Sequence, residues 1–181
     1  MRIVAIANQK GGVGKTTSTI NLGACLAALG KRVLILDLDP QANATSALGL
    51  SPDEHESLYQ SLVSATTIDH LIEPTRYERL SIIPSDMDLA GCEIELARGD
   101  DHMREHTAPD RFDFMLLDCP PSLGVLMTSA LAAADELVVP LQCEYFGLEG
   151  LSKIVQVTDQ VVYSGANPEL KIEGIVMTMA D

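Results

Sequence analysis

The stretch NQKGGVGKTTST, residues 8–19, decides the fold because it places a glycine-rich turn between an apolar run and a helical pattern. The apolar run covers residues 3–7, and the helical pattern covers residues 16–29. Successive glycines let backbone N–H groups point into one concavity and let the backbone approach an anion closely. The first turn of the helix adds the positive end of its dipole. The order of strand, glycine-rich turn and helix therefore predicts a phosphate-binding loop.

Two side chains of this loop carry specific chemistry. Lys15 is positioned to supply a mobile cation to the β- and γ-phosphates of a nucleotide, and the Thr16 hydroxyl to ligate Mg²⁺. The common pattern G-x-x-x-x-G-K-[ST] is met at its end but not at Gln9, where its first glycine would stand. The loop also carries a second lysine, Lys10, which the common pattern does not require. The residues predicted to bind phosphate are Lys10, Gly11, Gly12, Val13, Gly14, Lys15, Thr16 and Thr17.

Charge and composition restrict the class of protein. A chain of 181 residues with 46% hydrophobic residues is long enough for one domain with a sizeable core. The net charge is −14, yet residues 1–50 hold five Lys/Arg against two Asp/Glu. The only net positive segment thus contains the glycine-rich loop, where an anion is favourable. Elsewhere the negative surface repels phosphate backbones, so most of this surface is expected to bind nucleic acid poorly.

The four cysteines, Cys25, Cys92, Cys119 and Cys143, are too far apart for a zinc knuckle or a CxxC redox pair. Isolated thiols of this kind are typical of the reducing cytoplasm. The N-terminal apolar run of five residues is shorter than the hydrophobic region of a signal peptide. These features predict a cytoplasmic protein.

Apolar runs alternate with helical patterns along the whole chain. Runs that are apolar at nearly every position are typical of strands covered on both faces, which means a parallel sheet. The alternation predicts an α/β fold, a doubly wound, mostly parallel sheet with helices on both faces. Gly30 is expected to cap the first helix, Ser122 to start the fourth, and 99–111 to form a polar connection. The expected strands are 2–7, 32–38, 80–84, 112–118, 136–141 and 171–179, and the expected helices are 16–29, 54–62, 87–98, 122–134 and 147–163.

Carboxylates follow two of the expected strands at the edge where parallel sheets bind ligands. Asp37 and Asp39 end the run LDLDPQ, and period-two alternation puts them on one side if the strand continues through both. Asp118 ends the run FDFMLLD, where an acid can hold Mg²⁺ opposite the Thr16 hydroxyl. Asp37 is expected to be a support near Mg²⁺.

Several unusual motifs in one order resemble a known family. KGGVGKTT resembles the deviant Walker A loop of the ParA/MinD group of ATPases, in which Lys10 matches the extra signature lysine. LDLDPQANATSALG, FMLLDCPPSLG and VVPLQCEYFGLEGL narrow the resemblance to partition ATPases of the ParA or Soj type. Ala42 departs from that family, which often has glycine at this position, and this departure could stiffen the first switch.

The resemblance implies a P-loop NTPase fold, with ATP and Mg²⁺ bound and ATP slowly hydrolysed to ADP and phosphate. It implies that Lys10 crosses a dimer interface to the partner's phosphates, so that ATP lies between two subunits and switches dimerisation. Lys15 and Asp39 would complete the catalytic set, with Asp39 orienting the attacking water and accepting its proton. Thr16, Asp39 and Asp118 would hold the metal. Gln142 or Glu144 would lie at the dimer face.

The implied partners are a second copy of the chain, a ParB-like centromere-binding protein and, through the family's C-terminal part, non-specific DNA, with no membrane. The ATP-bound protein would then associate with the nucleoid. Two alternatives are a MinD-type membrane-associated ATPase and an iron protein-like redox ATPase, for which Cys92 and Cys119 are the conceivable cluster ligands. The chain stops directly after an expected strand. We therefore expect residues 1–181 to be one P-loop ATPase domain, incomplete at its C-terminal end, where the family's adenine-binding and DNA-binding residues lie.

Overall fold

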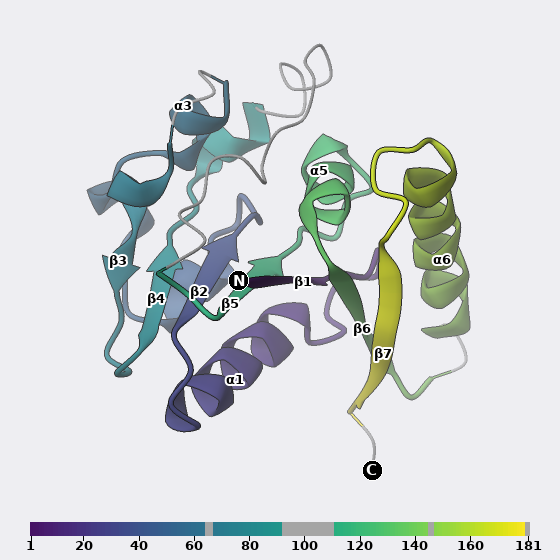
Figure 1. Cartoon of the computed structure of the whole chain (residues 1–181), viewed down its shortest axis with the longest axis horizontal. Coiled ribbons are helices and arrows are strands. Elements are labelled where there is room, and N and C mark those ends of the chain that lie inside the picture. The colour runs from purple at the N-terminus through teal and green to yellow at the C-terminus, as the bar shows by residue number, and fades with distance from the viewer. Residues whose placement is uncertain (64–66, 92–110, 145–146, 180–181) are drawn as a thin grey trace.

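The computed structural model describes residues 1–63, 67–91, 111–144 and 147–179 of the chain. These residues form a seven-stranded sheet in the order β3-β4-β2-β5-β1-β6-β7 (Figure 1). Every neighbouring pair is parallel except β3 and β4, which are antiparallel. The strands are β1 Arg2–Ile6, β2 Val33–Asp37, β3 Glu73–Pro74, β4 Leu80–Ile83, β5 Phe114–Asp118, β6 Glu136–Gln142 and β7 Lys171–Thr178.

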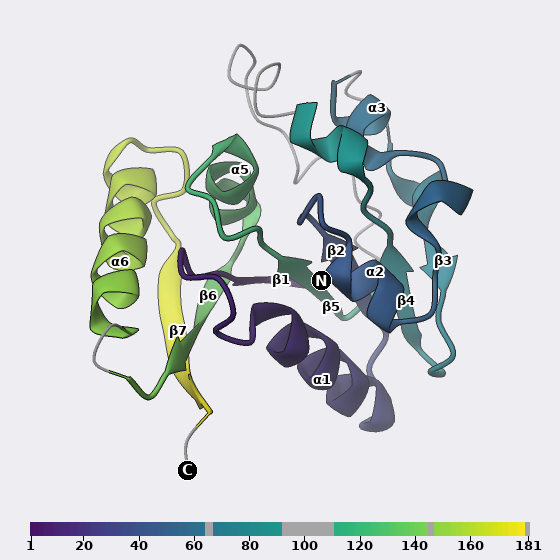
Figure 2. The ribbon, with the colours of Figure 1, turned by 180° about the vertical axis from the view of Figure 1, so that it is seen from behind.

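Helices cover both faces of this sheet, as the alternating pattern predicted. Figures 1 and 2 show α1 on one face, with α3, α5 and α6 on the other. Figure 2 also shows α2 beside the end of β2. The helices are α1 Lys15–Ala28, α2 Asn43–Ala47, α3 Leu58–Val63, α5 Val125–Ala133 and α6 Gly147–Tyr163, with 3-10 turns at Pro52–Glu54, Asp69–Leu71 and Met87–Gly91.

Two hydrophobic cores lie on the two faces because successive strand side chains point in opposite directions. Along β1, Ile3 and Ala5 pack with residues of α5 and α6, whereas Val4 and Ile6 pack with residues of α1 and α2. Each fully buried isoleucine or leucine stabilises the fold by roughly 1.5–3 kcal/mol. Strands that are apolar on both faces are thus held between two layers of helices, and this fixes the loops at their carboxyl ends.

The expected strands and four of the five expected helices are confirmed in type, and the starts of two of these helices are wrong by three or four residues. Gly30 follows α1 with a φ of 84°, as a C-terminal cap requires. The expected helix 54–62 begins only at Leu58, because His55 has an extended backbone that separates a 3-10 turn from α3. The expected helix 122–134 corresponds to α5, which begins at Val125 rather than at Ser122 because the backbone of Gly124 is extended.

The expected helix 87–98 lies only partly within the described residues. The structure describes only its first five residues, Met87–Gly91, and they form a 3-10 helix. The rest of that helix, and the expected connection 99–111 apart from Arg111, lie outside the described residues.

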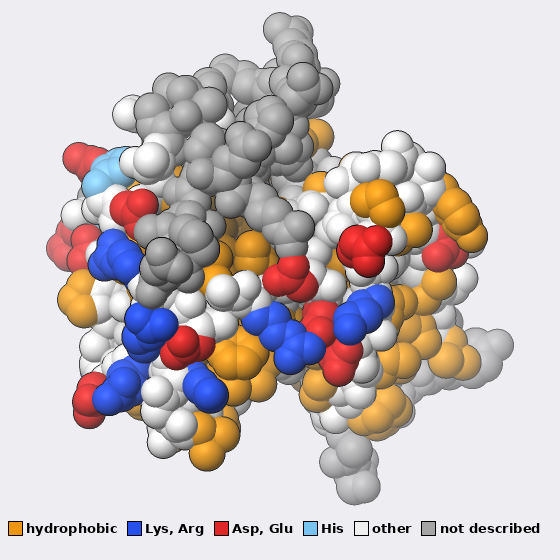
Figure 3. Space-filling view, in the orientation of Figure 1, with side chains coloured by type: hydrophobic (Ala, Val, Ile, Leu, Met, Phe, Trp, Pro, Cys, Tyr) orange, Lys and Arg blue, Asp and Glu red, His pale blue; other side chains and the backbone are white. Residues whose placement is uncertain are grey.

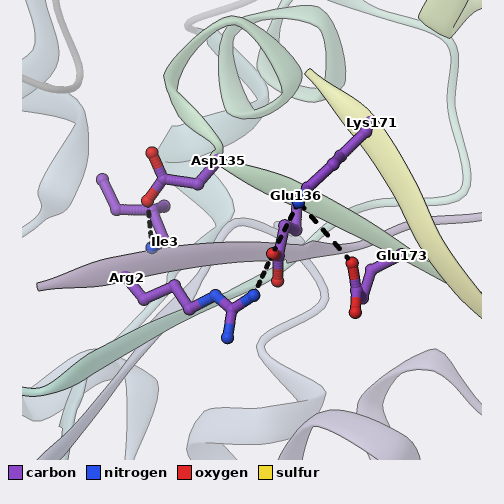
Figure 4. Close-up of polar contacts among 6 residues, drawn as sticks. All are labelled: Arg2, Ile3, Asp135, Glu136, Lys171 and Glu173. Carbon is purple, nitrogen blue, oxygen red and sulfur yellow. Dashed lines mark hydrogen bonds and ion pairs between the residues drawn. The ribbon is translucent and has the colours of Figure 1, made fainter. Parts of the chain in front are cut away.

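Charged side chains join three strands at the amino ends of β1, β6 and β7 (Figure 4). Glu136 is 5% exposed and contacts Arg2 on one side and Lys171, at 3.5 Å, on the other. Asp135 Oδ2 accepts a hydrogen bond from the Ile3 N–H at 2.8 Å. These contacts fix the register of the three strands at the end of the sheet opposite the glycine-rich loop.

The edge strand β7 carries exposed apolar side chains, which gather over it in Figure 3. Ile175 is 45% exposed and Met177 is 57% exposed. No helix among the described residues has the length and apolar character needed to span a membrane.

Candidate functional site

A pocket of about 390 Å³ lies at the carboxyl ends of the parallel strands. It combines the loop after β1 with the segments that follow β2, β5 and β7, which are far apart in the sequence. Its lining residues are Gly11, Gly12, Gly14, Lys15, Thr16, Thr17, Asp39, Gln41, Asn43, Pro121 and Met179. Of these, Gln41, Asn43, Pro121 and Met179 were not predicted; the first two lie within the DPQAN motif but carry no chemical signal that marks them as site residues.

The backbone of the loop depends on its glycines. Gly12 and Gly14 have φ values of 75° and 86°, a region that side chains with a Cβ rarely adopt. Gly14 is also the N-cap of α1, with no capping side chain and no acidic residue in the first turn. The N–H groups of that turn therefore remain available to an anion, which the helix dipole also favours.

Lys15 lies at the floor of this loop and is 7% exposed. Its Nζ donates a hydrogen bond to the backbone carbonyl of Lys10 at 3.3 Å. Burial lowers the pKa of Lys15, and the nearby carboxyls of Asp118 and Asp39 oppose that shift. The ammonium group is thus inside the pocket and bound to a neutral acceptor.

Asp118 ends β5 beneath the start of α1 and is fully buried. Its Oδ1 accepts a hydrogen bond from Thr19 Oγ1 at 3.0 Å, whereas its Oδ2 has no hydrogen-bond partner among the described residues. Burial raises the pKa of Asp118 to about 6, although the hydroxyls of Thr16 and Thr19 act to lower it. A buried carboxylate oxygen without a partner, beside a threonine hydroxyl, fits the oxygen ligands that Mg²⁺ prefers.

Asp37 and Asp39 take different positions because β2 ends at Asp37. Asp39 is 7% exposed and lines the pocket, where its Oδ1 accepts a hydrogen bond from the Gln41 N–H at 3.0 Å.

Asp37 is fully buried and does not line that pocket. Its Oδ2 accepts hydrogen bonds from the Thr45 N–H at 2.9 Å and from Thr45 Oγ1 at 2.8 Å. Burial raises the pKa of Asp37 to about 7. Asp37 therefore anchors α2, and Asp39 is the carboxylate available to a ligand.

The side chain of Lys10 points away from the pocket of its own loop. Its Nζ donates a hydrogen bond to Gln142 Oε1 at 3.1 Å and forms an ion pair with Glu144 at 3.6 Å. It lines a second pocket, of about 290 Å³, with Gln9, Glu149, Gly150 and Lys153. The two loop lysines are thus separated: Lys15 serves the pocket, and Lys10 lies on the side of α6.

Cys119 follows Asp118 and is 1% exposed. Burial raises the pKa of its thiol, so the thiolate is strongly disfavoured. The other cysteine of the redox alternative, Cys92, lies outside the described residues.

Comparison with known proteins decides the family. A family model described as an AAA domain matches residues 1–172. The chromosome partitioning protein ParA of Myxococcus xanthus is 47% identical over 99% of this chain. The sporulation initiation inhibitor protein Soj of Bacillus subtilis is 46% identical over 99% of it. The chain belongs to the ParA/Soj family of partition ATPases.

This ParA/Soj chain is shorter than those relatives. It spans 65% of the length of the Myxococcus protein and 73% of the Bacillus protein. Related solved structures share its P-loop fold. Cobyrinic acid a,c-diamide synthase from Mycobacterium smegmatis with bound ADP and magnesium has a TM-score of 0.94 and is 37% identical, over 100% of this chain and 76% of that chain. The ATP complex of a Cyanothece McdA variant has a TM-score of 0.89 and is 26% identical, over 98% of this chain and 70% of that chain.

Proposed function

We propose that the chain binds ATP and hydrolyses it slowly, and that ATP switches two copies into a dimer for chromosome or plasmid partitioning. The observation that carries the proposal is the separation of the two loop lysines. Lys15 is inside its own pocket, whereas the Lys10 ammonium is outside that pocket, on a partly exposed surface. A cation in the latter position is available to the phosphates of a second subunit, as an arginine finger in trans would be.

The residues have distinct roles in this proposal. Lys15 and the N–H groups of the loop hold the β- and γ-phosphates and stabilise charge on the transferring phosphoryl group. Thr16 and Asp118 would hold Mg²⁺, with Asp39 in the same pocket, and the bound metal would neutralise phosphate charge. Asp39 orients the attacking water and accepts its proton. Solved relatives with ADP, an ATP analogue and magnesium support this ligand and metal.

The proposed partners follow from the family. They are a second copy of the chain, a ParB-like centromere-binding protein and, through the family's C-terminal part, non-specific DNA. Among the solved neighbours is a plasmid partition protein from Borrelia burgdorferi, with a TM-score of 0.79 and 27% identity, which supports a role in partitioning.

The test compares Lys10→Ala with the wild-type protein by sedimentation velocity and by nucleotide titration, both with ATP and Mg²⁺. Loss of the proposed charged hydrogen bonds from Lys10 to the partner's phosphates should weaken the ATP-dependent dimer by at least about tenfold, while the monomer still binds nucleotide. Lys15→Ala is the control, because it should abolish nucleotide binding by the monomer and, with it, the ATP-dependent dimer. An ATP-induced dimer of wild-type strength in Lys10→Ala contradicts the trans-acting lysine.

A further inference from the structure

The end of β7 contacts the glycine-rich loop from across the sheet. Thr178, the last residue of β7, donates a hydrogen bond from its Oγ1 to the backbone carbonyl of Val13 at 2.8 Å. Its methyl group lies 3.5 Å from the point where a Cβ on Gly14 would stand. One side chain, 165 residues away in the sequence, thus contacts two consecutive residues of the loop.

This contact fixes the orientation of one peptide group. The carbonyl of Val13 and the N–H of Gly14 belong to the same planar, trans peptide, so they point in opposite directions. When the Thr178 hydroxyl holds the carbonyl oxygen, the Gly14 N–H is directed away from β7. Gly14 lines the pocket and caps α1, so its N–H is among the donors that an anion would meet.

The position of Thr178 is itself well determined. It pairs with Gln142 in the β6–β7 ladder, and its carbonyl accepts a hydrogen bond from the Cys143 N–H at 3.3 Å. Val13 is fully buried, so its carbonyl would lose its side-chain partner in a place where water has little access. A peptide without that partner loses a restraint on its orientation, and a rotated peptide would turn a carbonyl oxygen towards the phosphates.

We propose that Thr178 is a positioning residue of the nucleotide site, whose hydroxyl orients the Val13–Gly14 peptide so that the Gly14 N–H faces phosphate. The inference rests on the proposed function for its ligand. It assigns to the last strand of the described sheet a part in phosphate binding that none of the loop's own residues supplies.

The affinity test uses Thr178→Val, which keeps the shape and removes the hydroxyl, and Thr178→Ser, which keeps the hydroxyl. ADP and a non-hydrolysable ATP analogue are titrated with Mg²⁺ by calorimetry. Thr178→Val should bind both nucleotides about three- to tenfold more weakly, the equivalent of one hydrogen bond, and Thr178→Ser should bind within about twofold of wild type. Val176→Thr, on the same strand, is the control and should bind as wild type does.

A second measurement observes the peptide directly. The sequence contains one Val-Gly pair, Val13-Gly14, so valine labelled with ¹³C at the carbonyl and glycine labelled with ¹⁵N give one carbonyl–amide cross-peak. Without nucleotide, that carbonyl signal should move upfield in Thr178→Val and stay at the wild-type position in Thr178→Ser. ADP should move the amide signal in the wild type and in Thr178→Ser.

The outcomes are separable. A wild-type protein that binds neither nucleotide overturns the proposed function together with this inference. A wild-type protein that binds ADP, beside a Thr178→Val variant with equal affinity and an unmoved carbonyl signal, overturns this inference alone. If Thr178→Val does not fold, Thr178→Ser decides, because a tenfold loss of affinity in a variant that keeps the hydroxyl also overturns it.

Discussion

Lys10 shows how one loop can direct two like charges to different places. Its backbone N–H donates a hydrogen bond to Asn8 Oδ1 at 3.1 Å, which turns the chain before the glycines. The side chain then extends towards the end of β6, where Gln142 and Glu144 bind its ammonium group. In the proposed dimer those bonds must break before Lys10 reaches the partner's phosphates, so the cis contacts compete with dimerisation.

Replacing Glu144 should therefore strengthen the dimer. Glu144→Gln removes the carboxylate of the ion pair with Lys10 and retains Gln142 as a neutral acceptor. Because an exposed ion pair contributes little, the ATP-dependent dimer should tighten by about two- to fivefold, measured by sedimentation velocity. Glu149→Gln is the matched control, because its carboxylate pairs with Lys153 instead. A dimer weakened by Glu144→Gln would place that carboxylate in the interface rather than in competition with it.

The sequence predicts the site residues that belong to local motifs and misses the contacts between residues far apart in the chain. Lys15, Thr16 and Asp118 follow from local motifs, whose spacing is set by a loop, a helix start and a strand end. The contact of Lys10 with Gln142 joins residues 132 apart, and no local pattern encodes it. Ala42 is intermediate: the resemblance marked it as a glycine position, and its φ of 52° explains the preference.

Helix α6 packs closely against the loop that follows β1, and Gly150 permits this approach. A Cβ on Gly150 would lie 2.9 Å from Asn8 Oδ1 and 3.6 Å from the Cβ of Lys10. Asn8 is fully buried, and its Nδ2 donates a hydrogen bond to the Pro140 carbonyl at 2.7 Å, so it has little freedom to move.

Gly150→Ala should accordingly destabilise the protein despite its better helix propensity. A cost of about 1–3 kcal/mol from overpacking exceeds the gain of about 1 kcal/mol from propensity, so urea unfolding should show a net loss of stability. Ser152→Ala, at an exposed position of α6, should show a small gain instead. A Gly150→Ala variant more stable than wild type would mean that Asn8 moves freely.

The amino ends of β2 and β5 are joined by Arg32 and Asp113. Asp113 Oδ2 accepts a hydrogen bond from the Arg32 N–H at 2.8 Å, and Oδ1 accepts one from Nη2 at 2.9 Å. The side-chain hydrogen bond from Arg32 lowers the pKa of Asp113 to about 2. A lowered carboxyl pKa stabilises the folded state fully above the ordinary value of 3.8 and no longer does so once the pH falls through about 2.

Asp113→Asn should therefore lower the urea midpoint at pH 7 and equally at pH 5, and the difference from wild type should shrink below about pH 4. Asp159→Asn, at an exposed position of α6, is the control and should change little at any pH. A difference from wild type that stays constant down to pH 3 would show that the charge of Asp113 does not contribute.

The whole molecule carries a net charge of −14, which bears on its interaction with DNA. Because binding to a duplex depends on neutralising phosphates, we expect the 181-residue chain alone to retard non-specific DNA weakly or not at all, with or without ATP. Electrophoretic retardation at several salt concentrations checks this expectation. Tight, salt-sensitive retardation would contradict it and would require a basic face on this chain.

The fold could be predicted from the sequence more completely than the site. The six expected strands are present because a doubly covered parallel sheet needs continuous apolar runs, which are easy to recognise. The strand β3, with two residues, and the helix α2, with five, are too short to show a period and were missed. Thr178 was missed because its contact with Val13 depends on where β7 lies in the sheet order.

The pocket at the carboxyl edge draws on residues from Gly11 to Met179, almost the full length of the described chain. A ribosome must therefore release nearly all of this segment before the cavity can close. If the cavity binds nucleotide as proposed, its occupancy reports that the described segment has been synthesised and folded, so a fluorescent nucleotide analogue could time the folding of this segment in a nascent chain.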